Sequence, residues 1–257
     1  MPVEIIPIPC LSDNYAYLVR DGNEAVIVDP SDSGPVTATI EELGVRLVGI
    51  LCTHHHPDHV GGVSGLLAHH GSVPVIAHPR DAARITGASR TVEDGERFDL
   101  AGVEFRAIHV PAHTLGAVGF VANEKAVFTG DTMFVAGCGR LFEGTAAMMH
   151  RALTLGFGRL ADDVAVYPGH EYAEKNLRFA HEVEPDNATV TSHLARVQER
   201  RRAGLFCVPS TIGDEKATNP FMRANAAEVR AFAKSHGGNE NDPIDVLAAV
   251  RRARDEF

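Results

Sequence analysis

Short apolar runs rich in valine and isoleucine alternate with turns along the first two thirds of the chain. Glycine, proline, aspartate or asparagine bounds each run, which is typical of β-strands. The runs cover residues 3–8, 15–20, 25–29, 47–53, 73–78, 103–110, 117–122, 126–131 and 164–169. Because both tight turns and helical segments separate them, the pattern predicts a layered α/β (α+β) architecture.

A second pattern, with apolar residues three or four positions apart, indicates amphipathic helices. Three such segments interrupt the strands, at residues 34–44, 61–71 and 144–157. Beyond the last strand the pattern becomes helical, at residues 172–185, 187–204, 225–237 and 243–257. We therefore predict a sheet-rich domain over residues 1–170 and a helical C-terminal region over 171–257.

Composition narrows the class of protein. The 257 residues are 44% hydrophobic and 23% charged, as in an ordinary globular protein. A net charge of −10 argues against general binding to nucleic acid or anionic membranes, and an anionic substrate would need local positive charge. Neither a membrane-spanning apolar run nor a secretory signal pattern is visible, and the four cysteines are widely separated. We expect a cytoplasmic protein with reduced thiols, and a monomer.

The stretch Thr53-His54-His55-His56-Pro57-Asp58-His59 holds the densest set of metal-binding side chains. It directly follows an apolar run, so it lies at the end of a predicted buried strand, where α/β sheets place ligands. His54 and His56 alternate along the chain and would face one ion, whereas Asp58 and His59 follow a proline bend and would face a second. The alternative is a solvated histidine loop.

Three further candidates follow other predicted strands. His113, Asp131 and His170 each stand next to a glycine or proline turn, where a polar residue is commonly just a turn residue. Together they complete two ligand sets. The first is His54, His56 and His113; the second is Asp58, His59 and His170, with Asp131 able to bridge. Such donors suit zinc first, with iron or manganese as alternatives, and two close ions would hold a bridging hydroxide at neutral pH.

The remaining histidines are expected to be surface or structural residues: His55, His69, His70, His78, His109, His150, His181, His193 and His236.

This T-H-x-H-x-D-H motif with its downstream ligands resembles the metallo-β-lactamase superfamily. The segments LSDNYAYLV (11–19), FTGDTMFVAGCGRLFEGT (128–145), YPGHEYAEKNLRFAHEVEP (167–185) and NPFMR (219–223) are similar to the hydroxyacylglutathione hydrolase (glyoxalase II) family. The resemblance implies an αββα sandwich, followed by a helical substrate-binding domain. It also implies hydrolysis of the thioester S-D-lactoylglutathione to D-lactate and glutathione by a hydroxide on two metal ions.

The same resemblance implies catalytic roles for Asp58 and Asp131. It places the glutathione contacts on Arg140, Phe142, Tyr172, Arg251 and Arg254. These arginines would supply the local positive charge, although cations in a last helical turn also serve simply to offset the helix dipole. Phe142 lacks the hydroxyl of the tyrosine that many relatives carry. Alternatives are a glutathione persulfide dioxygenase or another hydrolase of this fold; an electron-transfer diiron domain fits less well, because such domains usually have a glutamate in the histidine motif.

Overall fold

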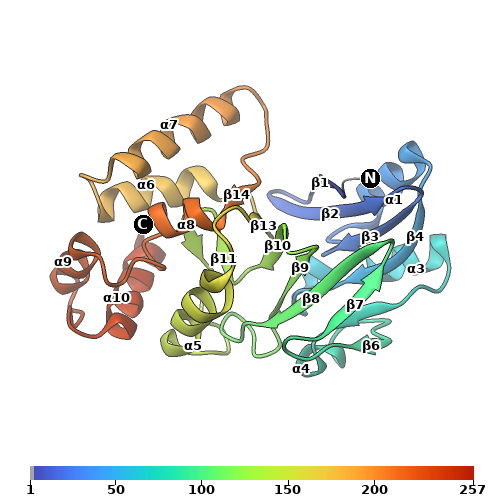
Figure 1. Ribbon diagram of the computed structural model, residues 1–257, viewed down its shortest axis with the longest axis horizontal. Coiled ribbons are helices and arrows are strands. Elements are labelled where there is room, and N and C mark those ends of the chain that lie inside the picture. The colour runs from blue at the N-terminus through green and yellow to red at the C-terminus, as the bar shows by residue number, and fades with distance from the viewer. Residues whose placement is uncertain (1–2) are drawn as a thin grey trace.

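Two six-stranded β-sheets stack face to face in the computed structural model, which describes residues 3–257 (Figure 1). The first sheet contains β1 (Glu4–Cys10), β2 (Asn14–Asp21), β3 (Glu24–Val28), β4 (Arg46–Leu51), β5 (Val75–Ala77) and β6 (Arg90–Thr91), in that order. The strands β1 to β3 pair antiparallel, whereas β3 to β6 pair parallel. Helical crossovers between the parallel strands explain the mixed pattern of the sequence.

The second sheet has the strand order β14-β13-β10-β9-β8-β7. Its strands are β7 (Arg97–Leu100), β8 (Val103–His109), β9 (Val118–Ala122), β10 (Ala126–Gly130), β13 (Ala165–Pro168) and β14 (Ser210–Thr211). The β10–β13 pair is parallel, so both strands end at the same edge. A small hairpin of β11 (Met133–Phe134) and β12 (Gly137–Cys138) follows β10.

The alternation of side chains along each strand decides which layer it contacts. On β2, Tyr17 and Val19 belong to the core between the sheets, together with Phe105 and Phe120 of the second sheet. The intervening Leu18 faces the other way, into a core formed with helices α1 and α3. The outer face of the second sheet is covered by α5 and the C-terminal helices. The order of layers is therefore helix, sheet, sheet, helix, as the family resemblance of the sequence implies.

The helices are α1 (Ser33–Leu43), α2 (Pro57–Val60), α3 (Val63–His70), α4 (Pro79–Ala82), α5 (Ala146–Arg151), α6 (Ala173–Val183), α7 (Ala188–Arg202), α8 (Ile212–Thr218), α9 (Ala227–Ser235) and α10 (Pro243–Glu256). The last five gather at one end of the molecule, opposite α1 and α3 (Figure 1). Every helix expected from periodicity is present.

The sequence did not predict α8 or β14. Both are short, and α8 begins at Ile212, directly after the N-cap residue Thr211, whose side chain accepts a hydrogen bond from the Asp214 backbone N–H. β14 lies beyond residue 170 and yet pairs with β13, so the second sheet includes a strand from the C-terminal region. Two residues carry no periodicity, which is why a pattern search passes over this strand.

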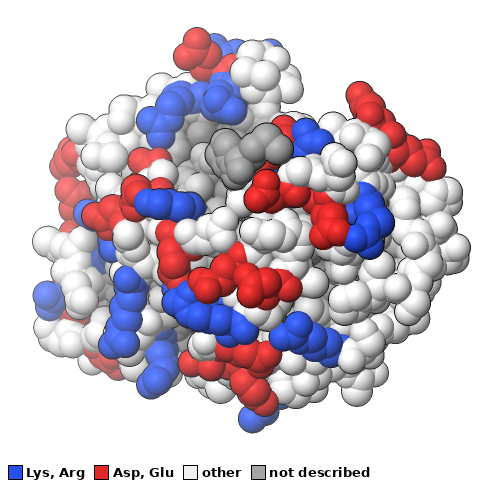
Figure 2. Space-filling model, turned by 45° about the vertical axis from the view of Figure 1, so that its right-hand side comes forward, with Lys and Arg blue, Asp and Glu red and all other residues white. Residues whose placement is uncertain are grey.

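Charge is mixed over the face shown in Figure 2, where basic and acidic side chains are interspersed. The acidic balance of the sequence therefore does not form one continuous patch on that face. Within residues 3–257, no helix is long and apolar enough to cross a membrane.

Candidate metal centre

The ends of four strands bring the predicted ligands to one edge of the sandwich. The THHHPDH stretch follows β4 and leads into α2, while Asp131 follows β10 and His170 follows β13. The parallel pairing of β10 with β13 places these last two side by side, and the Gly169 backbone N–H donates to the Gly130 carbonyl. His113 comes from the loop after β8. The rigid strand ends thus hold side chains that are far apart in the sequence.

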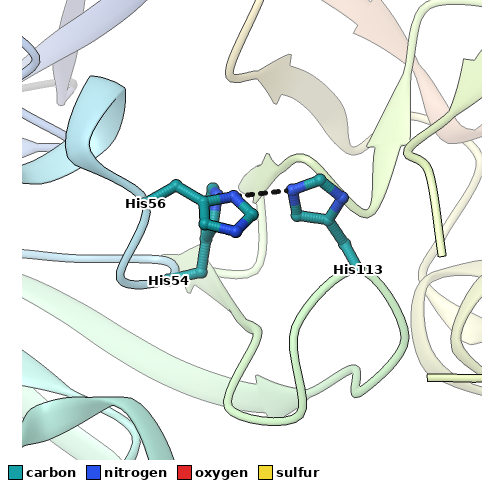
Figure 3. Close-up of side chains that lie close together, drawn as sticks. All are labelled: His54, His56 and His113. Atoms are coloured by element: carbon teal, nitrogen blue, oxygen red, sulfur yellow. Dashed lines mark hydrogen bonds between the residues drawn. The ribbon is translucent and has the colours of Figure 1, made fainter. Parts of the chain in front are cut away.

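His54, His56 and His113 form the first group, with one ring nitrogen of each lying within 4.8 Å of the others. The Nδ1 atom of His56 lies 3.1 Å from Nε2 of His54 and 3.0 Å from Nε2 of His113. Figure 3 shows the three rings converging, His54 and His56 from one loop and His113 from the loop opposite. The sequence paired these three residues, and the fold brings them together.

Asp58, His59 and His170 form the second group under the same 4.8 Å limit. Asp131 lies between the two groups. Its Oδ2 is 3.5 Å from His113 Nε2 and 3.4 Å from His170 Nε2, while its Oδ1 is 3.2 Å from His59 Nε2. One carboxylate therefore contacts members of both sets, which is the geometry that a bridging ligand needs.

Neighbouring groups orient four of the five histidines through Nδ1, so that Nε2 faces the site. Nδ1 of His59 lies 2.9 Å from Asp29 Oδ2, and Nδ1 of His170 lies 2.8 Å from Asp13 Oδ1. His54 and His113 are oriented in the same way, by the Thr53 hydroxyl at 3.1 Å and the Arg140 carbonyl at 2.9 Å. An acceptor on Nδ1 keeps the proton there and leaves Nε2 free to ligate a metal.

A third group, Asp29 with His54 and His59, also satisfies the 4.8 Å limit. Both Asp29 oxygens already accept hydrogen bonds, one from the Thr53 backbone N–H and one from the Thr53 hydroxyl. Asp29 also meets the Nδ1 side of His59, away from the other ligands. We interpret it as an orienting residue.

Burial and charge act differently on the two sets. Burial holds the pKa of His54 well below its ordinary value and, with the nearby His113 ring, lowers the pKa of His56 to about 4. These rings are neutral at pH 7, the form that binds metal. Burial also lowers the pKa of His170, but the carboxylates of Asp131 and Asp58 outweigh it and raise that pKa to about 10. His170 therefore holds a proton beside the carboxylates of Asp58 and Asp131, and a metal ion bound by the same atoms would replace that proton.

Two buried atoms test whether metal fits here. His59 Nε2 and Asp131 Oδ1 are buried, and although they lie 3.2 Å apart, neither makes a hydrogen bond of good geometry with any described residue. An unsatisfied buried polar atom costs about 1–3 kcal/mol, so such atoms in native sites call for a partner. With imidazole and carboxylate donors on every side and no thiolate among them, the residues fit divalent cations of borderline or hard character.

Close packing at the site requires glycine at position 169. A Cβ atom there would lie 2.5 Å from His59 Cε1 and 2.6 Å from Asp131 Oδ1. The glycine that precedes His170 in the sequence is therefore needed to let two ligands approach each other, besides making the turn.

A pocket of about 430 Å³ opens beside the two groups. All five residues expected to contact substrate line it, namely Arg140, Phe142, Tyr172, Arg251 and Arg254. Tyr172 stacks on the His170 ring at 4.8 Å, and Phe142 contacts His113 edge-on at 5.1 Å between ring centroids. The three arginines of the pocket thus lie near the candidate metal ligands.

Several residues of the site escaped the sequence reasoning. Asp13, Asn14 and Asp29 contact ligands from elements more than 25 positions away, and Asn14 Nδ2 donates to both the Asp58 carbonyl and its carboxylate. Lys175 and Asn176 line the pocket. Asp13 and Asn14 lie within the segment LSDNYAYLV. This segment contributed to the family resemblance, but neither residue was given a role from the sequence.

The histidines set aside from the ligand sets lie outside the three groups. His55 is buried, with Nδ1 2.9 Å from Asp81 Oδ2, and His109 stacks on His78 at 3.9 Å. Cys138 does line the pocket, but burial raises the pKa of its thiol to about 11, which does not favour a nucleophilic thiolate.

Comparisons with known proteins agree with this geometry. A family model described as "Metallo-beta-lactamase superfamily" matches residues 12–187, and one described as "Hydroxyacylglutathione hydrolase C-terminus" matches residues 171–257. A hydroxyacylglutathione hydrolase of Alkalilimnicola ehrlichii is 45% identical, covering 98% of this chain and 99% of that protein. One of Ruegeria pomeroyi is 39% identical over 100% of both.

Among solved structures, TTHA1623 in a di-iron-bound form is 26% identical, with a TM-score of 0.60. The match covers 85% of this chain and 99% of that one.

Proposed function

This chain belongs to the hydroxyacylglutathione hydrolase family of the metallo-β-lactamase superfamily, and from that membership we propose how its residues divide the work. The protein is a metal-dependent hydrolase that cleaves the thioester of a hydroxyacylglutathione, the glyoxalase II reaction. The observation that carries the residue assignment is the position of Asp131, which contacts members of both ligand groups beside a pocket lined by arginines.

We assign two divalent ions to the two groups. His54, His56 and His113 would hold one, Asp58, His59 and His170 would hold the other, and Asp131 would contribute its carboxylate to both. We expect zinc, although the same donors accept iron or manganese. When bound, the ions supply a water of lowered pKa and a Lewis acid for the thioester carbonyl. Asp58 remains a carboxylate, because hydrogen bonds with His170 and Asn14 lower its pKa, and we assign it to orienting the attacking water.

The pocket residues bind the glutathione half of the substrate in this proposal. Arg140, Arg251 and Arg254 attract its carboxylates, while Tyr172 and Phe142 provide aromatic surface next to the ligands. Arg251 is 9% exposed and donates to the Cys138 carbonyl at 2.7 Å, so its guanidinium is fixed in place. Most of these side chains come from residues 171–257, which supports assigning substrate binding to that C-terminal region.

Phe142 reaches the pocket without a hydroxyl, and the residue is 61% exposed. It therefore offers apolar contact and leaves hydrogen bonding to its neighbours.

The test is hydrolysis of S-D-lactoylglutathione and of the matching N-acetylcysteamine thioester, with metal content measured on the same sample. We expect turnover of the glutathione substrate at a much lower KM, because only glutathione carries carboxylates for the arginines. Equal KM values would contradict the binding assignment. Oxygen consumption with glutathione persulfide, without thioester hydrolysis, would instead establish the dioxygenase alternative.

We also propose a cytoplasmic monomer. All four cysteines are free and buried, a state common in reducing compartments. Among the described residues, the exposed large apolar side chains are spread along the chain, and only Leu205 and Phe206 are neighbours in sequence. Light scattering after size exclusion tests the oligomeric state.

A further inference from the structure

Among the described residues that line the pocket, one carboxylate is not a candidate metal ligand. Asp255 lines the pocket near the C-terminal end of α10, and its side chain is 43% exposed. Its Oδ1 accepts a hydrogen bond from Arg140 Nε at 3.1 Å and another from an Arg251 terminal nitrogen at 3.1 Å. A single oxygen thus joins two of the three guanidinium groups that we assign to the carboxylates of glutathione.

Asp255 is in an unfavourable position for a negative charge. It lies in the last turn of α10, where the helix dipole already places partial negative charge and where cations are the stabilising residues. Its negative charge in the pocket would also repel an anionic substrate. Arg140 and Arg251, which donate hydrogen bonds to Asp255, and the nearby Arg254 offset both effects.

The arginines do not depend equally on this carboxylate. Arg251 is also held by the Cys138 carbonyl and lies over the Phe221 ring at 5.3 Å. Arg254 is held by the neutral Asn176 side-chain oxygen at 3.1 and 3.3 Å. Removing the Asp255 charge should therefore leave Arg251 and Arg254 in position. Arg140, in contrast, would lose the carboxylate that its guanidinium contacts.

We propose that Asp255 is a specificity-determining residue whose carboxylate competes with a substrate carboxylate for Arg140 and Arg251. The inference rests on the proposed function, since it takes glutathione derivatives as the ligands. In the free protein Asp255 occupies the place of the incoming anion, so binding exchanges one carboxylate for another. The exchange weakens affinity for the glutathione portion and favours its release after the thioester is cleaved.

The test is Asp255→Asn, which keeps the shape and one acceptor oxygen while removing the charge. The interaction of two unit charges about 4 Å apart in water corresponds to roughly a five-fold change in a binding constant. We expect KM for S-D-lactoylglutathione to fall about five-fold, with a smaller change in kcat. We expect no such fall for the same thioester with both glutathione carboxylates esterified.

Asp163→Asn is the matched control, because Asp163 pairs with Lys125 at the opposite end of β13 and its loss changes net charge equally. A KM that is unchanged or raised in Asp255→Asn would overturn the proposal. An equal fall with the ester or in the control variant would overturn it too, since neither depends on the displaced carboxylate.

Binding of S-methylglutathione, which cannot be hydrolysed, separates this inference from the proposed function. Calorimetry on the metal-loaded protein should show tighter binding to Asp255→Asn by the same factor. If the native protein does not hydrolyse lactoylglutathione but this tightening is seen, the proposed function fails and the inference stands. If hydrolysis is seen without tightening, or if neither protein binds the thioether, the inference fails.

Discussion

Replacing Asp29 by asparagine tests how the fold prepares a histidine for metal. Asp29 is buried, and its Oδ1 accepts from the Thr53 backbone N–H at 2.7 Å. Its Oδ2 lies 2.6 Å from the Thr53 hydroxyl and 2.9 Å from His59 Nδ1. Its φ of 49° is left-handed, a conformation that asparagine tolerates well. The substitution therefore changes hydrogen bonding while keeping shape and backbone.

The asparagine oxygen must stay opposite the Thr53 N–H, because that group only donates. The amide NH₂ then replaces Oδ2 and donates to His59 Nδ1, which moves the ring proton to Nε2, the nitrogen that faces Asp131. A protonated Nε2 cannot ligate. Loss of an orienting partner typically weakens metal binding about 10- to 100-fold, or roughly 1.4–2.7 kcal/mol.

Zinc titration of the metal-free protein against a competing chelator measures this effect for each ion. We expect the ion assigned to Asp58, His59 and His170 to bind more weakly in Asp29→Asn. The affinity for the ion assigned to the three-histidine group should change little. Asp13→Asn is the control, since the Asp13 side chain is 40% exposed and water can take its place beside His170. Two equivalents bound with native affinity in Asp29→Asn, at unchanged thermal stability of the metal-free protein, would refute the tautomer argument.

Three further predictions concern bridging, substrate binding and buried charge. Asp131→Ala should lose activity and bind fewer than two metal equivalents, because Asp131 contacts both groups; two full equivalents would contradict bridging. Arg251→Ala should raise KM for lactoylglutathione more than it lowers kcat, while Arg252→Ala, at an exposed position, should not; an unchanged KM refutes the contact. Burial raises the pKa of Glu215 from 4.5 to about 7, so the folded protein retains a proton that the unfolded chain loses. The free energy of unfolding of the native protein should therefore fall by up to ~3 kcal/mol between pH 4.5 and 7, relative to that of the Glu215→Gln variant. Urea unfolding at each pH measures this, and the same pH dependence in both proteins would contradict the prediction.

The candidate metal ligands could be chosen from the sequence, because each follows a strand that the local pattern reveals. The alternation of apolar residues marks where a buried strand ends, and a histidine or aspartate at that point needs no distant information to be found. The fold class, the two three-residue groups and the central position of Asp131 could all be expected on that basis. The resemblance in the later segments added the substrate.

Some roles could be assigned only from the folded chain. The orienting partners Asp13 and Asp29 stand in turns that look like any other, and they meet His170 and His59 only after the sheets have formed. The strand β14 is two residues long, so pairing with β13 defines it, not periodicity.

Asp255 shows the difference most clearly. In the sequence it is one acid in a charged helix end, and a surface role would be the ordinary expectation. The fold brings Arg140, 115 positions earlier, against it and turns both toward the ligands. Local pattern determines which side chains a strand or helix presents, because it depends on neighbours along the chain. The pairing of charged side chains from distant elements depends on how those elements pack, so only the tertiary structure decides it.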